Sequence, residues 1–118
     1  MLSLHCLTLI VYMEARNQSE KTQIEVASFA IERAEQDNLS ICASMKKPKL
    51  YSWLWDGTYT PIDKEHFEKK TKPLAKLELS RKKRTLTGYH HFTNCKVKPF
   101  PGKVYKSGDI CFYKGDLK

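Results

Sequence analysis

The stretch that decides the fold is Leu4–Arg16, which reads LHCLTLIVYMEAR. No formally charged side chain precedes Glu14 in the chain. At about 100° per residue, a helix here turns Glu14 to within about 60° of three apolar side chains, Leu7, Ile10 and Val11. The sequence therefore predicts a carboxyl group on the apolar side of its own helix, near the C-terminal end.

Burial against hydrocarbon disfavours the ionised form of a carboxyl group and raises its pKa. Such a group keeps a proton near neutral pH and can donate it, as the general acid of a glycosidase must. The structural alternative is a glutamate that ends the helix at the surface. Glu14 is therefore a candidate catalytic acid, and its burial is the property that separates the two interpretations.

The length of 118 residues predicts a single domain, 1–118, with a modest core. Lys and Arg number 21 against 13 Asp and Glu, for a net charge of +8. Residues 1–40 hold six acids and three bases, and the remainder holds seven acids and 18 bases. A basic surface of this kind suits nucleic acid, an anionic membrane face or an acidic polymer, and charge alone does not choose among them.

The apolar run Leu2–Met13 is far shorter than the roughly 20 residues that span a bilayer. It also lacks the basic leader and the small-residue cleavage site of a secretory signal. We therefore expect no stable membrane insertion, no export signal and synthesis in the cytoplasm.

The four cysteines, Cys6, Cys42, Cys95 and Cys111, form no C-x-x-C pair, which disfavours a zinc knuckle or a thioredoxin-type motif. Cys6 lies in the apolar helix and is expected to be a core residue. An even count permits up to two disulfides, and the pairing is left open.

A second helix is expected over Thr22–Gln36. Its apolar stripe comprises Ile24, Ala27, Ile31 and Ala34, and its water-facing acids are Glu25, Glu32 and Glu35. A third helix is expected from the N-cap Asp63 to Lys83, with a kink or a break at Pro73.

After Thr85 the chain changes to short apolar runs separated by Gly and Pro, which predict strands near Tyr89–Phe92, Val104–Tyr105 and Ile110–Tyr113. The fold class expected is α+β, mainly helical, with a short C-terminal β-hairpin.

The loop Lys46–Pro61 reads KKPKLYSWLWDGTYTP and is unusually rich in aromatic residues. Asp56-Gly57 is a turn signal, but a turn does not require two Trp and two Tyr nearby. These rings are either exposed stacking faces for sugars or bases, or a lid on the core.

Four separated motifs occur together in this chain: Y-M-E-A-R at Tyr12–Arg16, Y-S-W-L-W-D-G at Tyr51–Gly57, T-G-Y-H-H-F-T-N at Thr87–Asn94 and I-C-F-Y at Ile110–Tyr113. In order and spacing they resemble the spore-cortex-lytic and cell-wall hydrolase family of the SleB and CwlJ type. The resemblance implies a lysozyme-like domain that cleaves peptidoglycan between N-acetylmuramic acid and N-acetylglucosamine, with Glu14 as the catalytic glutamate. The short chain further resembles a bacteriophage endolysin, which is made in the host cytoplasm and acts on the wall after release.

The chain departs from the family pattern at several positions. Met13 and Asn17 stand where the family has glycines, and Leu50-Tyr51 replaces Gln-Phe. The residues that carry over from the motifs are Glu14, Ser52, Asp56 and His91. In this interpretation Ser52 and His91 orient sugar substituents, while Tyr12, Trp53 and Tyr89 line the groove. His91 as a structural histidine and Trp53 as a core lid are the alternatives.

Glycosidases usually employ two carboxylates. Asp56 is the candidate partner of Glu14, although an Asp before Gly ordinarily makes a turn. Without a second carboxylate, the resemblance implies a lytic transglycosylase in which Glu14 acts first as acid and then as base towards the sugar's own 6-hydroxyl. The expected partners are peptidoglycan and anionic envelope polymers. We expect a monomer without cofactor or metal.

A non-enzymatic nucleic-acid-binding module is the competing class. Its support is the net charge together with interleaved aromatic residues, Tyr51, Trp53, Trp55 and Tyr59. No recognised nucleic-acid-binding motif accompanies them, so binding to nucleic acid is not the expectation. A metal site formed by His90, His91 and Cys95 is a third hypothesis.

Overall fold

Helix α1 (Leu2–Ala15) forms over the apolar stretch that the sequence singled out, and it ends directly before Arg16. The computed structural model describes residues 2–47, 50–55, 61–96 and 103–114. Leu7, Ile10 and Val11 are all buried, which confirms the predicted apolar side of α1.

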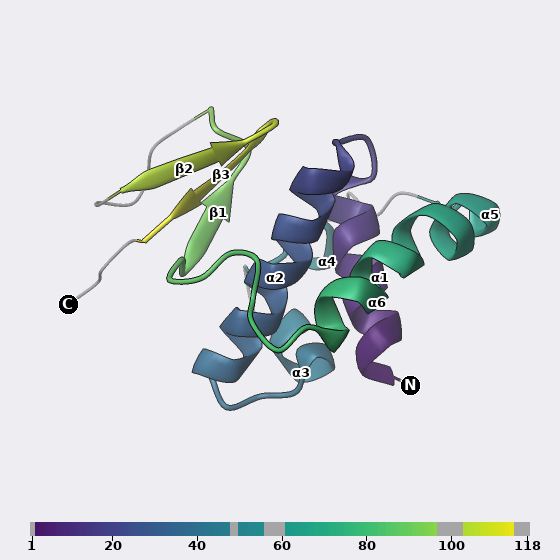
Figure 1. Ribbon diagram of the computed structural model, residues 1–118, viewed down its shortest axis with the longest axis horizontal. Helices are drawn as coiled ribbons and strands as arrows, with labels where there is room; N and C mark the ends of the chain where they lie inside the picture. The colour runs from purple at the N-terminus through teal and green to yellow at the C-terminus, as the bar shows by residue number, and fades with distance from the viewer. Residues whose placement is uncertain (1, 48–49, 56–60, 97–102, 115–118) are drawn as a thin grey trace.

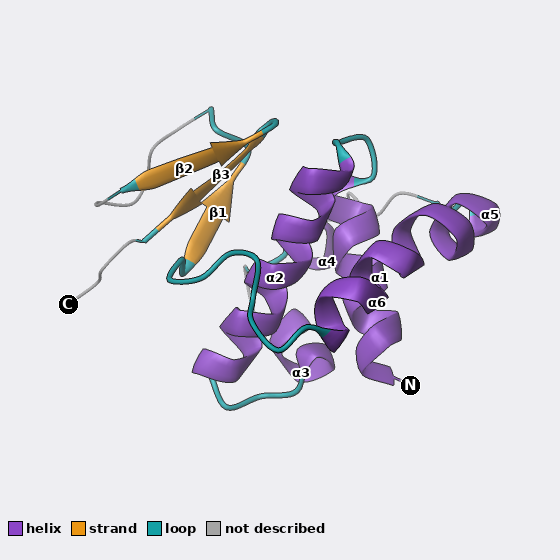
Figure 2. Ribbon diagram, in the orientation of Figure 1, coloured by secondary structure: helices purple, strands orange, loops and turns teal. Residues whose placement is uncertain are grey.

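Helix α2 (Glu20–Gln36) begins two residues earlier than expected, because Ser19 is its N-cap and its Oγ accepts a hydrogen bond from the Thr22 N–H at 3.2 Å. The helix lies between the other long helices and the sheet (Figures 1 and 2). A helix that is covered on one side by helices and on the other by a sheet buries residues on more than one face. The expectation that Glu25 faces water is therefore wrong, since Glu25 is buried on the side towards the sheet.

Two short helices follow. Helix α3 (Ile41–Met45) is capped by Ser40, whose Oγ accepts from the Ala43 N–H, and the disulfide Cys6–Cys42 joins this helix to α1. Helix α4 (Ser52–Trp55) lies within the aromatic loop. Cys6 is thus a buried core residue, as expected, and also part of a covalent link between two helices.

The predicted third helix is divided into α5 (Lys64–His66), the π-helix η1 (Phe67–Thr71) and α6 (Lys72–Ser80). Asp63 is the N-cap, as predicted, because its Oδ1 accepts from the backbone of Glu65 and His66. Pro73 supplies no N–H and its ring would collide with the carbonyl four residues earlier in a regular α-helix. The predicted interruption of the helix at Pro73 is present as the π-helix η1, whose wider turn comes just before Pro73.

Helix α6 ends at Ser80, before the expected boundary at Lys83. The cause is Glu78, which is fully buried and accepts hydrogen bonds from both the N–H and the hydroxyl of Thr85, at 2.7 and 2.6 Å. Arg84 donates to the Glu78 carbonyl at 2.8 Å. These contacts fold the basic segment 81–84 back over the helix end.

The C-terminal region forms a three-stranded antiparallel sheet in the order β1-β3-β2, from β1 (His91–Thr93), β2 (Val104–Ser107) and β3 (Ile110–Tyr113). The expected hairpin is the β2–β3 pair, and β1 adds a third strand to it. A second disulfide, Cys95–Cys111, links the chain after β1 to β3. The α+β class is therefore confirmed.

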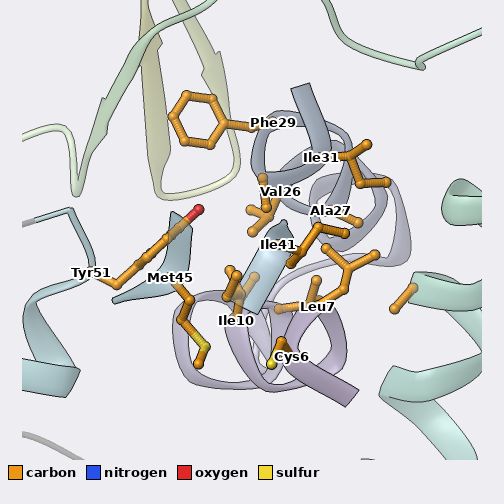
Figure 3. Packing of buried hydrophobic residues seen from close by; sticks show 14 of the residues in the cluster. Cys6, Leu7, Ile10, Val26, Ala27, Phe29, Ile31, Ile41, Met45 and Tyr51 are labelled. Atoms are coloured by element: carbon orange, nitrogen blue, oxygen red, sulfur yellow. The ribbon is translucent and has the colours of Figure 1, made fainter. Parts of the chain in front are cut away.

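A buried cluster joins the sheet to the helices (Figure 3). The ring of Phe29 on α2 lies 5.2 Å from that of Phe92 on β1 and 5.6 Å from that of Phe112 on β3, measured between centroids. Tyr51 reaches into the same cluster from the aromatic loop and is 1% exposed. The apolar contact of α2 with the sheet therefore sets where the strands lie.

A polar network reinforces this contact. The Glu25 carboxylate accepts hydrogen bonds from the Ser107 hydroxyl, from the Tyr105 hydroxyl at 2.7 Å and from Lys21 Nζ at 3.2 Å. Ser107 is also within 2.8 Å of the Thr22 hydroxyl. A buried carboxylate is tolerated when donors surround it, and these donors come mainly from β2.

We expect Glu25→Ala to lower the free energy of unfolding by about 2–3 kcal/mol, because it leaves hydroxyl groups on β2 without their acceptor. Urea denaturation followed by circular dichroism measures this change. The control is Glu35→Ala on the same helix, an exposed position where the change should stay within about 0.5 kcal/mol. Equal effects of the two substitutions would contradict the anchoring role of Glu25.

Candidate functional site

A partly open pocket of about 360 Å³ lies between the end of α1 and the sheet. We call it the Glu14 pocket. Its described lining residues are Glu14, Gln18, Leu50, Phe92, Thr93, Asn94, Asp109 and Ile110. Its volume falls within the range of small-molecule binding sites.

Glu14 is half-buried on the wall formed by α1. Burial raises the pKa of its carboxyl group from 4.5 to about 7, and a hydrogen bond from the Trp53 side chain partly opposes this rise. The predicted environment of Glu14 is therefore present: the carboxyl group holds a proton near neutral pH beside a pocket that a ligand can enter.

Two aromatic residues of the loop lie behind the carboxyl group. Trp53 is 5% exposed and Tyr51 is 1% exposed, with ring centroids 6.3 Å apart. Burial, followed by the nearby charge of Glu14, raises the pKa of the Tyr51 hydroxyl, so this group stays protonated. Both rings thus form a lid on the core, and Trp53 also interacts with the Glu14 carboxyl group. Their burial removes them as exposed stacking faces for sugars as well as for bases, and the predicted groove residue Trp53 is absent from the described lining of the pocket.

The lining of the Glu14 pocket also includes a carboxylate that the sequence did not indicate, that of Asp109. Asp109 lies in the turn between β2 and β3, and it is exposed. The Gln18 side chain makes two hydrogen bonds with Asp109. The Asp109 N–H donates to Gln18 Oε1 at 3.0 Å, and Gln18 Nε2 donates to Asp109 Oδ2 at 3.3 Å. The two acidic side chains of the described lining, Glu14 and Asp109, therefore belong to opposite ends of the chain.

The remaining lining combines apolar and polar groups. Leu50, Phe92 and Ile110 give an apolar floor, while Thr93 and Asn94 supply hydrogen-bonding groups at the end of β1. Thr93 Oγ1 donates to the Tyr113 hydroxyl at 3.2 Å and accepts from the Cys95 N–H at 3.1 Å. A sugar ring has apolar faces and hydroxyl edges, and this lining matches both.

The other predicted site residues lie elsewhere or outside the described residues. Tyr12 is 3% exposed, and its hydroxyl accepts from the Asp63 N–H at 3.0 Å. Two residues along a helix correspond to about 200°, so Tyr12 faces η1 while Glu14 faces the sheet. The predicted groove-lining role of Tyr12 is therefore corrected to a buried structural one.

Tyr89 and His91 are also absent from the described lining of the pocket. The Tyr89 ring packs near Tyr105 and Phe112, with Lys114 Nζ 4.7 Å from its centroid. His91 is half-buried on β1, where burial lowers the pKa of its ring. Of the T-G-Y-H-H-F-T-N motif, Phe92, Thr93 and Asn94 line the pocket, whereas the predicted contacts of Tyr89 and His91 with the substrate are not part of this lining.

Asp56, the predicted partner carboxylate, lies outside the described residues, and so does the side chain of Ser52. In the hypothetical metal site of His90, His91 and Cys95, the Cys95 sulfur is not available as a ligand because it is in a disulfide. His90 Nδ1 lies 2.8 Å from the Lys114 carbonyl oxygen. Within the described ranges, no group of three His, Cys, Asp or Glu side chains is placed to hold a metal ion. None of the helices in those ranges is long and apolar enough to cross a membrane.

Sequence reasoning missed Gln18 and Asp109. The only local signal was the S-G-D turn between two apolar runs, which marks a hairpin and not a site. Gly108 in this turn has φ +58°, and a Cβ there would collide with Gln18 Oε1. The absence of a side chain at Gly108 thus leaves room for the Gln18 side chain to contact the turn. This contact joins residues that are far apart in the sequence, so only the folded structure shows it.

Comparison of the chain with protein-family models, with curated proteins and with solved structures finds no match. The function is therefore argued from the geometry of the Glu14 pocket.

The raised pKa of Glu14 has a consequence for stability. The folded state binds this proton more tightly than the unfolded state, so the stabilisation is present below pH 4.5 and is lost as the pH rises through about 7. The change corresponds to about 3 kcal/mol at most. We expect Glu14→Gln to be more stable than the wild type by up to this amount at pH 8, and equal to it near pH 4.

Urea denaturation at a series of pH values measures the difference. Glu35→Gln removes an exposed carboxylate of the same kind and should leave the pH dependence unchanged. A Glu14→Gln protein that is no more stable than the wild type at pH 8 would show that Glu14 is not held in an unfavourable environment for its charge.

Proposed function

We propose that this protein cleaves the glycan strands of peptidoglycan between N-acetylmuramic acid and N-acetylglucosamine, with Glu14 as the general acid. The observation that carries the proposal is the carboxyl group of Glu14, protonated near neutral pH at the wall of a pocket of about 360 Å³. The choice of peptidoglycan rests on the resemblance of the four motifs to cell-wall hydrolases. The domain is lysozyme-like in this proposal.

The chemistry follows from the environment of Glu14. A glycosidic oxygen is a poor leaving group until it is protonated, and a carboxylic acid with a pKa near the working pH transfers its proton most effectively. The hydrogen bond from Trp53 becomes stronger when Glu14 is ionised, so it stabilises the carboxylate that remains after proton transfer. Phe92 and Leu50 support the apolar face of the sugar, and Thr93 and Asn94 contact its polar substituents.

The positive surface of α5, η1 and α6 supports an anionic target. Lys64, Lys70 and Lys76 are exposed, and no carboxylate of the described residues is within 4 Å of them. Long-range attraction of this kind concentrates a polyanion near the protein and weakens with salt. The proposal includes anionic envelope polymers as partners and action on the host wall as a phage endolysin, in monomeric form without cofactor.

We expect Glu14→Gln to lower the rate of peptidoglycan solubilisation at least about 100-fold, because the amide cannot donate an acidic proton. Zymography on purified cell wall and loss of turbidity measure this rate. Glu35→Gln, with equal loss of charge at an exposed site, should keep wild-type activity. Clearing that survives Glu14→Gln would remove Glu14 from its proposed role. Salt-sensitive binding to single-stranded DNA without any clearing would favour the nucleic-acid alternative.

The pH profile provides a second check. Glu14 is active in its protonated form, so the rate should fall about tenfold per pH unit above the pKa of about 7. Initial rates of turbidity loss between pH 5 and 9, at constant ionic strength, measure the profile. A rate that continues to rise up to pH 9 would contradict the role of Glu14 as proton donor.

A further inference from the structure

We infer that the Cys95–Cys111 disulfide positions the wall of the Glu14 pocket, so that the pocket takes up a glycan strand only in the oxidised protein. The inference rests on the proposed function for its substrate and adds a redox condition to the same site. Three observations carry it: the place of this disulfide in the pocket wall, the backbone that it holds, and the contrast with the second disulfide, Cys6–Cys42.

The Cys95–Cys111 disulfide joins two segments of the pocket lining. Cys95 directly follows the lining residues 92–94, and Cys111 directly follows the lining residues 109–110. The first segment is the end of β1 with the residue after it, and the second leads from the β2–β3 turn into β3. A covalent link between these segments limits how far apart the two parts of the wall can lie.

The sheet by itself does not extend over the whole first segment. The last pair in the register of β1 with β3 is Thr93 with Cys111, and Asn94 lies beyond it. Cys95 has φ +73°, which is uncommon for a residue with a side chain, and its N–H donates to Thr93 Oγ1 at 3.1 Å. The disulfide holds the chain in this turn. The placement of Thr93 and Asn94 in the pocket therefore depends on it.

The Cys6–Cys42 disulfide has a different position. It joins α1 to α3, and neither of its cysteines belongs to the described lining of the pocket. Cys6 lies about two helical turns before Glu14, on a part of α1 that the buried side chain of Leu7 also holds in the core.

The two disulfides also differ in the length of chain that they close. Cys6–Cys42 closes the longer loop, with a sequence separation of 36 against 16 for Cys95–Cys111. Its loss is therefore expected to destabilise the fold at least as much. Loss of stability and loss of the pocket wall can thus be measured separately, each with its own pair of cysteines.

Reduction releases the wall in a balanced exchange with a dithiol. Cys95 is half-buried and Cys111 is 6% exposed, so a small thiolate approaches the Cys95 sulfur. The S–S bond breaks, and the Cys111 thiolate leaves and takes a proton. The second thiol of the reagent then displaces Cys95 as a thiol. Two electrons and two protons pass to the protein, and the reagent becomes a cyclic disulfide.

The surroundings then decide whether the pocket wall is in place. A compartment rich in thiols keeps such a pair reduced, whereas oxidising surroundings preserve the disulfide. In the proposed role as an endolysin, the dependence on Cys95–Cys111 withholds cleavage while the protein is in the cytoplasm and permits it after release.

The first test compares the rate of peptidoglycan solubilisation before and after reduction with dithiothreitol, with thiol titration as the check on complete reduction. The reduced wild type should be at least about tenfold slower, since a misplacement of about 1 Å can cost about 100-fold. Reoxidation with oxidised glutathione should restore the rate. Equal rates in the two states would overturn the inference. An oxidised wild type that releases nothing would instead remove the proposed function.

The second test assigns the effect to one disulfide. Cys6→Ala/Cys42→Ala keeps the Cys95–Cys111 disulfide, so it should have the wild-type rate when oxidised and lose it in dithiothreitol. Cys95→Ala/Cys111→Ala should be slow and insensitive to dithiothreitol, although urea denaturation should show it to be no less stable than the first variant. The opposite pattern of rates would overturn the inference.

The third test needs no substrate and no variant at the pocket. Amide hydrogen exchange is measured on Cys6→Ala/Cys42→Ala, oxidised and reduced, so that one disulfide changes. Reduction should speed exchange at Cys95 and Lys96 about tenfold or more, while Ile10 and Val11 of α1 keep their protection. Unchanged exchange at Cys95 would overturn the inference. Faster exchange in a protein that clears no cell wall would confirm the positioning role, although the proposed function had failed.

Discussion

The contact between α2 and the sheet is the constraint on which the rest of the structure depends. Phe29 packs against rings of β1 and β3, and Glu25 accepts hydrogen bonds from β2. The apolar residues of β3 are buried, and the rings of Phe92 and Phe112 contact Phe29 of α2, so the sheet takes its position from the helix. The Glu14 pocket exists because this contact holds the sheet at a set place beside the end of α1.

Glu14 on α1 and Glu25 on α2 both turn their carboxyl groups towards the interior, but the surroundings of the two groups differ. Glu25 is surrounded by donors from β2 and from its own helix, and these hydrogen bonds support the fold. Among the described residues, Trp53 is the side chain that favours the ionised form of Glu14, and burial raises the pKa of Glu14 to about 7. The first arrangement stabilises the folded state, whereas the second destabilises it above neutral pH. Groups held at a cost to stability are characteristic of functional sites.

Periodicity predicted the helices and strands well, because each depends on neighbours three, four or two positions away. The errors have identifiable tertiary causes. Glu25 was expected at the surface because the helical pattern cannot show that α2 is covered on two sides. The third helix was expected to run on to Lys83, whereas Glu78 binds the Thr85 backbone and ends it at Ser80.

The sequence by itself determined that an acid lies near the end of an apolar helix, that the region after Thr85 contains a hairpin, and that Glu14 is the residue to test. Only the tertiary structure decided which residues share the pocket with it. Tyr12, two positions away, faces the other side of α1, whereas Asp109, from the far end of the chain, lines the same pocket and is held by Gln18. The physical reason is that local geometry sets the direction of a side chain, while the packing of the sheet on α2 sets what that side chain meets.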